Sequence, residues 1–202
     1  MDARKRAAKN EMTRTYTLKK RADSQAETRR RIVEAAVELH GTIGPARTTF
    51  SMVAGRAGVQ RHTLYAHFPD ERSLTMACSA LAMERDPLPD AAPWRAIEDR
   101  RERLRTGLAA IHAWYERNAQ LVGCVLRDAE YDPLIQEIAG LRMGPYLTAY
   151  HDVLGAKLTM KQRAVLHLAL SFHTWRTLTE AGLKRAGAVR VLVQAIEGAS
   201  EA

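Results

Sequence analysis

Apolar residues recur every three or four positions through most of the chain, a spacing typical of amphipathic α-helices. The first such run follows the stretch SQAE, Ser24 to Glu27, which fits a helix-capping box, and it ends at Gly41 and Gly44. No pair of alternating segments suggests a β-hairpin. The pattern therefore predicts an all-α protein whose first helix begins at about Ser24.

Three short helices are predicted to follow. Thr49 is a suitable N-cap for a helix that reaches Ala57, where Gly58 breaks it. Residues Gln60–Phe68 form the next helix, and Asp70 caps the one after it. The turn at Gly58 thus separates two short helices, as in a helix-turn-helix.

A proline-rich loop from Asp86 to Pro93 divides these helices from a second helical set. Asp132-Pro133 and the stretch TMKQ, Thr159 to Gln162, each mark a further helix start. The later helices are expected at Trp94–Asn118, Leu121–Ala129, from Pro133 onward, at Thr159–Ala181 and at Val189–Ile196. We expect an arm at residues 1–23, one domain at residues 24–85 and another at residues 93–202.

Length and composition indicate a folded chain of one or two domains. It has 202 residues, 46% of them hydrophobic, and only two cysteines, Cys78 and Cys124, too few for a disulfide framework. No apolar run approaches the roughly 18 residues of a membrane span, and the N-terminus lacks a signal-type apolar stretch. We therefore expect a cytoplasmic protein that is not associated with a membrane.

Positive charge is concentrated at the start of the chain. The net charge is +8, and residues 1–70 hold 14 Lys and Arg against 7 Asp and Glu, whereas the remainder holds 17 against 16. Eight basic residues lie within residues 1–23, which read as a flexible arm: Arg4, Lys5, Arg6, Lys9, Arg14, Lys19, Lys20 and Arg21. This asymmetry favours contact between the first third and a polyanion, although a basic solvated surface would look the same.

The stretch GVQRHTLYAHFPDE, residues 58–71, carries two histidines and two aromatic residues. His62 and His67 are five positions apart, which disfavours a shared metal on one helix face, and the short helices offer little core for an active site. Val59, Leu64 and Phe68 can instead anchor the helix. The polar residues Gln60, Arg61, His62, Thr63, Tyr65 and His67 then face outward, where they suit DNA bases and phosphates.

At these residues the chain resembles the tetracycline-repressor-type (TetR) family of transcriptional regulators. The shared pattern is Thr48-Thr49, Val53-Ala54, Ala57-Gly58-Val59 and the run TLYAHF, Thr63 to Phe68. The resemblance covers roughly residues 24–80 and implies an N-terminal three-helix DNA-binding domain. It also implies a C-terminal helical domain that binds an effector and forms a homodimer.

The resemblance assigns roles to individual residues. It makes Tyr65 and His67 phosphate contacts, places Gln60, Arg61 and His62 at the major groove, and puts Thr63 at the start of a phosphate clamp. Two further contacts are expected from the preceding helix, at Thr49 and at Ser51, where some members carry a base-reading arginine. Glu71 stands where the family usually has a phosphate-binding lysine, so Arg72 is the candidate to replace it.

The C-terminal half offers candidates for an effector pocket. We select Trp114, Met143, Tyr146, Tyr150 and His173 because they come from three predicted helices and mix aromatic, soft and polar groups. Each could equally be ordinary core. No catalytic triad, phosphate-binding loop or paired-carboxylate motif occurs, so we predict neither an enzyme nor a bound metal or cofactor.

The closing helices complete the prediction. They carry apolar residues that the resemblance assigns to a dimer interface: Val165, Leu168, Ala169, Phe172, Val189, Leu192, Val193 and Ile196. We expect a homodimeric, ligand-responsive repressor that binds a double-stranded DNA operator and a small-molecule effector. One alternative is a constitutive DNA-binding dimer without an effector pocket, and another is a small-molecule enzyme or carrier with an incidental basic arm.

Overall fold

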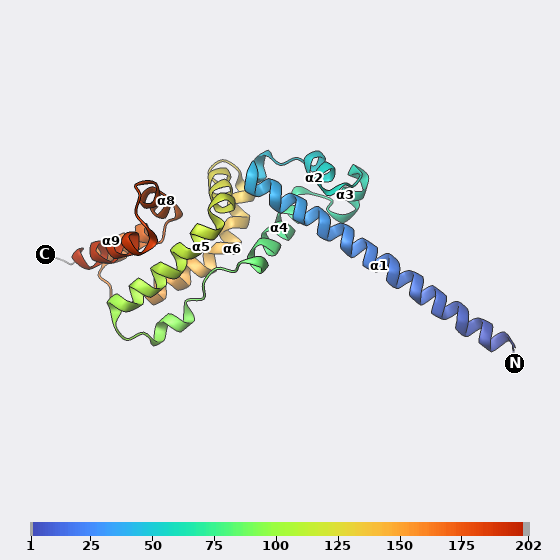
Figure 1. Ribbon diagram of the computed structural model, residues 1–202, viewed down its shortest axis with the longest axis horizontal. Coiled ribbons are helices and arrows are strands. Elements are labelled where there is room, and N and C mark those ends of the chain that lie inside the picture. Colours follow the sequence, from blue (N-terminus) through green and yellow to red (C-terminus); the bar gives the residue numbers. More distant parts are fainter. Residues whose placement is uncertain (1, 200–202) are drawn as a thin grey trace.

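The computed structural model describes residues 2–199, and their side chains from Lys19 onward. Over residues 2–199 it is built entirely of helices, which confirms the all-α prediction (Figure 1). The elements are α1 (Asp2–Thr42), η1 (Pro45–Arg47), α2 (Phe50–Ala57), α3 (Arg61–His67), α4 (Glu71–Arg85), η2 (Ala92–Ala96), α5 (Arg100–Ala129), α6 (Pro133–Leu154), α7 (Met160–Ala169), α8 (Phe172–Glu180) and α9 (Arg185–Gly198).

Helix α1 is 41 residues long, and its first part projects away from the other helices (Figure 1). The predicted start at Ser24 is wrong, because the helix already runs through this position and the Thr28 hydroxyl donates to the Ser24 carbonyl at 2.9 Å. Residues 2–23 lie in α1 and not in an irregular arm; their alanines, lysines and arginines favour helix. Five of the arm's eight basic side chains, those before Lys19, lie outside the described residues.

The first four helices share a small hydrophobic core. Ile32 and Ala36 of α1 meet Val53 of α2, Leu64 of α3 and Leu74 of α4 there. The predicted caps of α2 and α4 form: the Thr49 hydroxyl accepts from the Met52 N–H at 3.3 Å and the Asp70 carboxylate from the Ser73 N–H at 2.7 Å. These caps fix where each short helix begins, which sets the position of α3.

Helices α5 to α9 surround a second, larger core, and α5 and α6 lie side by side in it (Figure 1). The two segments predicted at 94–118 and 121–129 are one continuous helix, because nothing between Asn118 and Leu121 interrupts the backbone hydrogen bonds. Helix α5 begins at Arg100, and Asp99 caps it through a carboxylate that accepts from the Glu102 N–H. Trp94 lies before it, in the 3-10 helix η2.

The long helix predicted from Thr159 to Ala181 is two helices. The capping box of Thr159 and Gln162 forms as expected, but α7 ends at Ala169 and Ser171 caps α8. The Tyr115 hydroxyl of α5 donates to the Leu170 carbonyl at 2.7 Å, which occupies a backbone acceptor at the break. A hydrogen bond from the larger core thus overrides the local helical pattern.

Candidate nucleic-acid interface and interdomain cavity

The turn between α2 and α3 is held by backbone geometry and by α1. Gly58 has φ 64°, the left-handed region that favours glycine, and the Val59 N–H donates to the Ala54 carbonyl at 3.0 Å. The Arg31 guanidinium of α1 donates to the carbonyls of Ala57 and Gly58 at the end of α2. The angle between α2 and α3 is therefore supported from both sides of the turn.

Helix α3 presents a polar face on two buried anchors. Leu64 and Phe68 are almost completely buried, and Val59 is half-buried against the same core, as predicted. The residues expected to face outward do so to different degrees: Gln60, Arg61, His62 and Tyr65 are exposed, whereas Thr63 and His67 are half-buried. A seven-residue helix held by its apolar side can lie against a flat or grooved partner with the other.

The aromatic ring of Tyr65 is supported from α2. Its centroid lies 5.0 Å from that of Phe50, so one side of the ring packs on α2 while the residue as a whole stays exposed. Thr49 and Ser51 at the start of α2 are exposed as well, although the Thr49 hydroxyl also serves as the helix cap. The candidate residues of α2 and α3 thus form one continuous surface.

Arg72 of α4 pairs with a residue of α6. Its guanidinium makes two hydrogen bonds, of 2.6 and 2.7 Å, with the carboxylate of Glu137 on α6. This bidentate pair lowers the pKa of Glu137, chiefly through the hydrogen bond, and joins α4 to the C-terminal helices. A phosphate contact by Arg72 would compete with this pair.

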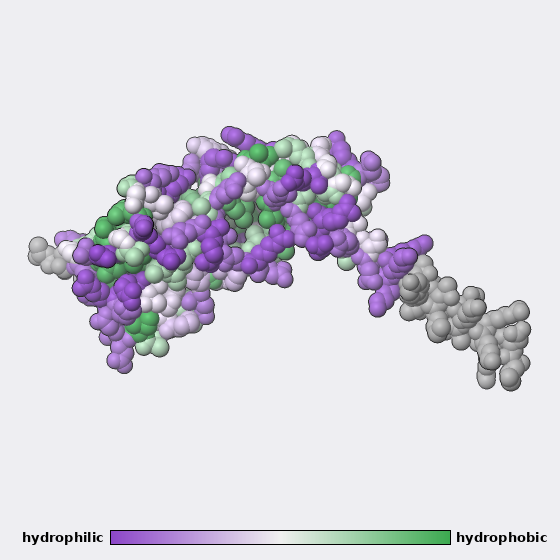
Figure 2. Space-filling model, viewed as in Figure 1, coloured by the Kyte–Doolittle hydropathy of each residue, from purple (hydrophilic) through white to green (hydrophobic). Residues whose placement is uncertain are grey.

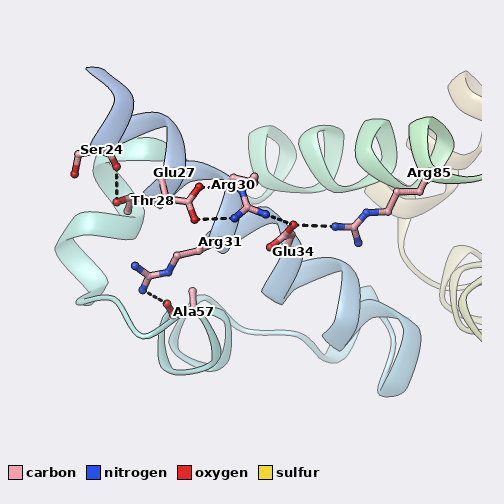
Figure 3. A network of polar contacts seen from close by, with 8 residues as sticks. All are labelled: Ser24, Glu27, Thr28, Arg30, Arg31, Glu34, Ala57 and Arg85. Carbon is pink, nitrogen blue, oxygen red and sulfur yellow. Dashed lines mark hydrogen bonds and ion pairs between the residues drawn. The ribbon is translucent and has the colours of Figure 1, made fainter. Parts of the chain in front are cut away.

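A network of charged side chains connects α2 and α4 to α1 (Figure 3). Arg30 contacts both Glu27 and Glu34 on α1, and Glu34 also accepts from Arg85 at the end of α4, at 3.0 Å. Arg56 of α2 pairs with Glu38 of α1. Most of these groups are exposed, so each pair contributes little energy alone, and together they set the orientation of the helices.

A cavity of about 100 Å³ lies where α1 and α4 meet α5 and α6. Hydrophobic residues show near the middle of the visible face in this region, while hydrophilic residues cover most of the surface (Figure 2). The cavity is lined by Val37, His40, Pro45, Thr75, Cys78, Ser79, Ala82, Met83, Trp114, Asn118, Leu121, Val122, Val125, Ile135, Ile138, Ala139, Arg142 and Met143. It thus lies between the two cores and not inside the C-terminal one.

The structure brings two of the five predicted ligand residues to this cavity, Trp114 and Met143. Tyr150 is fully buried, with its hydroxyl donating to the Pro89 carbonyl at 2.7 Å, and burial raises its pKa. Tyr146 packs half-buried against the C-terminal core, and His173 is exposed on α8. These three do not line the cavity.

Sequence reasoning missed the polar residues of the cavity wall, among them Arg142 and His40. A signal for Arg142 was present, because it follows Ile135 and Ile138 at helical spacing and so continues an apolar face with a cation. The Arg142 guanidinium donates to the Ser79 hydroxyl and the Met76 carbonyl of α4, both at 3.0 Å. Arg142 therefore connects the two helical sets across the cavity.

A second connection lies at the end of α1. The Asp128 carboxylate of α5 is buried, accepts from the Ala46 N–H at 3.0 Å and is paired with Arg127, which donates to the Ile43 carbonyl at 2.9 Å. Burial lowers the pKa of the nearby His40 to about 4, against a smaller opposing effect of Asp128. Gly44 has φ 97°, and a Cβ there would overlap Arg127 and Asp128.

No three His, Cys, Asp or Glu residues gather as a metal site in the described part of the chain. Among the described helices, none combines the length and the apolar character needed to cross a membrane.

A short helix with a buried apolar side and an exposed polar side, set by a tight turn, defines the class of helix-turn-helix DNA-binding regulators. Residues 32–78 match the family model of bacterial regulatory proteins of the tetR family. The match places this helix-turn-helix segment with the DNA-binding domains of tetR-family transcriptional regulators. No curated protein matches the chain.

Solved structures of the same fold cover most of the chain. A tetR-family transcriptional regulator from Streptomyces coelicolor is 17% identical, with a TM-score of 0.58 over 86% of this chain and 80% of its own. The fatty acid degradation regulator FadR from Bacillus halodurans is 15% identical, with a TM-score of 0.59 over 85% and 95%. The multidrug binding protein EbrR is 18% identical, with a TM-score of 0.58 over 84% and 89%. At these identities the likeness concerns the fold alone.

Proposed function

We propose that this regulator is a homodimeric repressor whose hold on its operator is released by a small-molecule effector. The observation that carries the proposal is the polar face of α3, which is exposed while Leu64 and Phe68 anchor the helix from behind. We assign DNA binding to residues 24–85, a supporting basic arm to residues 1–23, and effector binding and dimerisation to residues 93–202.

In the DNA complex, α3 enters the major groove. Gln60, Arg61 and His62 at its N-terminal end contact base edges, since these exposed side chains can donate to or accept from bases. Thr63, Tyr65 and His67 contact phosphates together with Thr49 and Ser51 of α2. The exposed Lys19, Lys20 and Arg21 of α1 add sequence-independent attraction to the backbone.

The effector occupies the cavity between α1, α4, α5 and α6, where Trp114 and Met143 contact it. A ligand in this position touches both helical sets, so it can favour one arrangement of α4 and hence of α3 over another. Its influence on operator affinity equals its difference in affinity for the two arrangements. FadR and EbrR, which share the fold, are a regulator of fatty acid degradation and a multidrug binding protein, and small molecules suit both roles.

The dimer forms through the outer faces of α7 and α9. Several residues that the resemblance assigned to the interface, including Val189, Val193 and Ile196, are buried within one protomer and serve as core. Leu168 and Val191 remain exposed, at 58% and 45%, and Met160 lies two helical turns before Leu168. Pairing these faces about a two-fold axis buries the apolar side chains and presents two copies of α3 to one side.

The dimer has a direct test. Replacing both Leu168 and Val191 by Glu should give a folded monomer in analytical ultracentrifugation, because it places charges in the apolar interface. Leu141→Glu is the matched control, since Leu141 is 54% exposed on α6 and lies outside the proposed interface. A double variant that sediments as a dimer moves the interface to another surface.

Selection of bound duplexes from random DNA tests the proposed function as a whole. A dimer predicts two inverted half-sites centred about 34–36 Å apart, one turn of DNA. Genomic sites that match the selected sequence should then lose occupancy when the effector is added. A site that is bound equally under all conditions would favour a constitutive DNA-binding dimer, and enrichment of no sequence would contradict the proposal.

A further inference from the structure

The cavity between the helices has an uneven electrostatic character. Its wall is mostly apolar, and Arg142 is the one lining residue with a permanent charge. No Asp or Glu is among the lining residues. Burial lowers the pKa of His40 to about 4, so at neutral pH this side chain is uncharged and offers hydrogen bonds only. The nearest carboxylates behind the wall, Asp86 and Asp128, are each paired with an arginine outside the lining, so Arg142 is the one full charge that faces the cavity.

The charge of Arg142 is only weakly compensated. Its hydrogen bonds go to the Ser79 hydroxyl and the Met76 carbonyl, both neutral acceptors on α4. By contrast, Arg72 on the outer surface of α4 is matched by the carboxylate of Glu137. A guanidinium forms stronger bonds with an anion than with neutral groups, and its planar donors fit a carboxylate two at a time.

We propose that the cavity selects a compact apolar molecule with one carboxylate, and that Arg142 is the residue that recognises the carboxylate. This inference rests on the proposed function, because it names the chemical class of the effector. The volume limits the body of the ligand: about 100 Å³ is less than a cavity of roughly 150 Å³ that holds benzene, so the body is smaller than benzene, a short branched chain or a small ring.

Recognition and response then involve the same side chain. The bonds to Ser79 and Met76 use two of the five guanidinium N–H groups, those on Nε and Nη2, and a carboxylate that binds this edge of Arg142 exchanges them for bonds to the ligand. The exchange removes a connection between α6 and α4, the helix that follows α3 along the chain. The ligand therefore changes the link to the DNA-binding helices by the contact that identifies it.

Binding to the full-length protein without DNA tests the chemistry. The probes are matched in shape and differ in charge: pivalate, neopentyl alcohol and neopentylamine, with cyclopropanecarboxylate, cyclopropylmethanol and cyclopropylmethylamine as a smaller set. Calorimetry measures affinity, and the fluorescence of Trp114 in the cavity wall reports the location. In at least one set, the carboxylate should bind about tenfold tighter than the alcohol, and the amine most weakly.

Variants separate recognition from folding. Arg142→Gln should remove the advantage of the carboxylate over the alcohol while alcohol binding persists, which also shows that the cavity is intact. Ala139→Phe fills the cavity and should abolish binding of all probes. Arg176→Gln, at an exposed position on α8, is the control and should bind as the unaltered protein does.

The outcomes distinguish this inference from the function on which it rests. Equal affinity for acid and alcohol, preference for the amine, or binding of none of the six probes overturns the carboxylate assignment, even if the protein binds an operator. Conversely, a carboxylate preference that depends on Arg142 supports it. Operator affinity that does not change at saturating carboxylate would then contradict the effector role and leave the binding chemistry established.

Discussion

Two sets of contacts join the DNA-binding helices to the C-terminal helices, and they are chemically different. At the end of α1, Arg127 and Asp128 reach backbone groups of Ile43 and Ala46, and the Asp128 side chain is nearly fully buried. Between α4 and α6, Arg72 pairs with the carboxylate of Glu137, and both side chains are about half exposed. Arg142 of α6 donates to the Ser79 hydroxyl and the Met76 carbonyl of α4.

The difference indicates which connection moves. The Asp128 carboxylate is buried, so breaking its bond to the Ala46 N–H leaves a buried acceptor without a partner. An exposed ion pair can be exchanged for solvent, DNA or ligand at little cost. We infer that the contact at Ile43–Ala46 is the pivot and that the α4–α6 contact is the part that rearranges.

The largest effect is expected at the pivot. Gly44→Ala forces a side chain into a backbone conformation with φ 97° and against Arg127 and Asp128, which should lower the free energy of unfolding by about 3 kcal/mol. Urea denaturation measures the loss. Gly55→Ala is the control, because no atom lies within 4 Å of its added Cβ, and should be neutral or slightly stabilising. Equal stability of both variants would contradict the inference that the contact at Ile43–Ala46 is a rigid pivot.

The second-largest effect is expected from a lower pH, which should destabilise the fold through His40, next to the pivot. Burial lowers the pKa of His40 from 6.5 to about 4, so the unfolded chain binds more protons between these values and stability falls as pH falls through this window. From pH 7 to pH 5 the His40 contribution is about 2 kcal/mol, and His112 and His151, whose pKa values burial also lowers, act in the same direction. His40→Gln should flatten the curve of unfolding free energy against pH. An unchanged curve would mean that His40 is not held uncharged.

The smallest effect is expected at the exposed Arg72–Glu137 pair between α4 and α6. Glu137→Gln removes the partner of Arg72 and should leave the free energy of unfolding almost unchanged, because the pair is exposed and screened by solvent. If the freed Arg72 reaches a phosphate, the slope of log operator affinity against log salt steepens by about 1. Glu130→Gln, another exposed acid of the C-terminal half, is the control. No change of slope would mean that Arg72 acts only between the helices.

The DNA-binding half was predictable because its signals are local. The Thr49 and Asp70 caps, the Gly58 turn and the burial of Leu64 and Phe68 all follow from residues within a few positions of one another. The start of α1 was not, since a capping box at Ser24 competes with a preceding stretch of good helix formers.

The cavity could not be located from the sequence because it depends on packing between distant helices. Trp114 and Met143 were recognised as candidates, yet Tyr150 has the same composition signal and is core, because its hydroxyl finds the Pro89 carbonyl. The break between α7 and α8 is of the same kind, since Tyr115 on α5 supplies the hydrogen bond at Leu170. Only three-dimensional contacts distinguish these cases.

Base reading by α3 is the central claim, and a comparison of two variants on two DNAs tests it most directly. Affinities for the selected operator and for a random duplex are measured for Arg61→Ala and Tyr65→Phe at one salt concentration. Arg61→Ala should reduce discrimination between the two DNAs by about 1–3 kcal/mol, whereas Tyr65→Phe should weaken both alike through loss of a phosphate hydrogen bond. If Arg61→Ala weakens both duplexes equally, α3 does not read bases through Arg61 and the account of this interface is wrong.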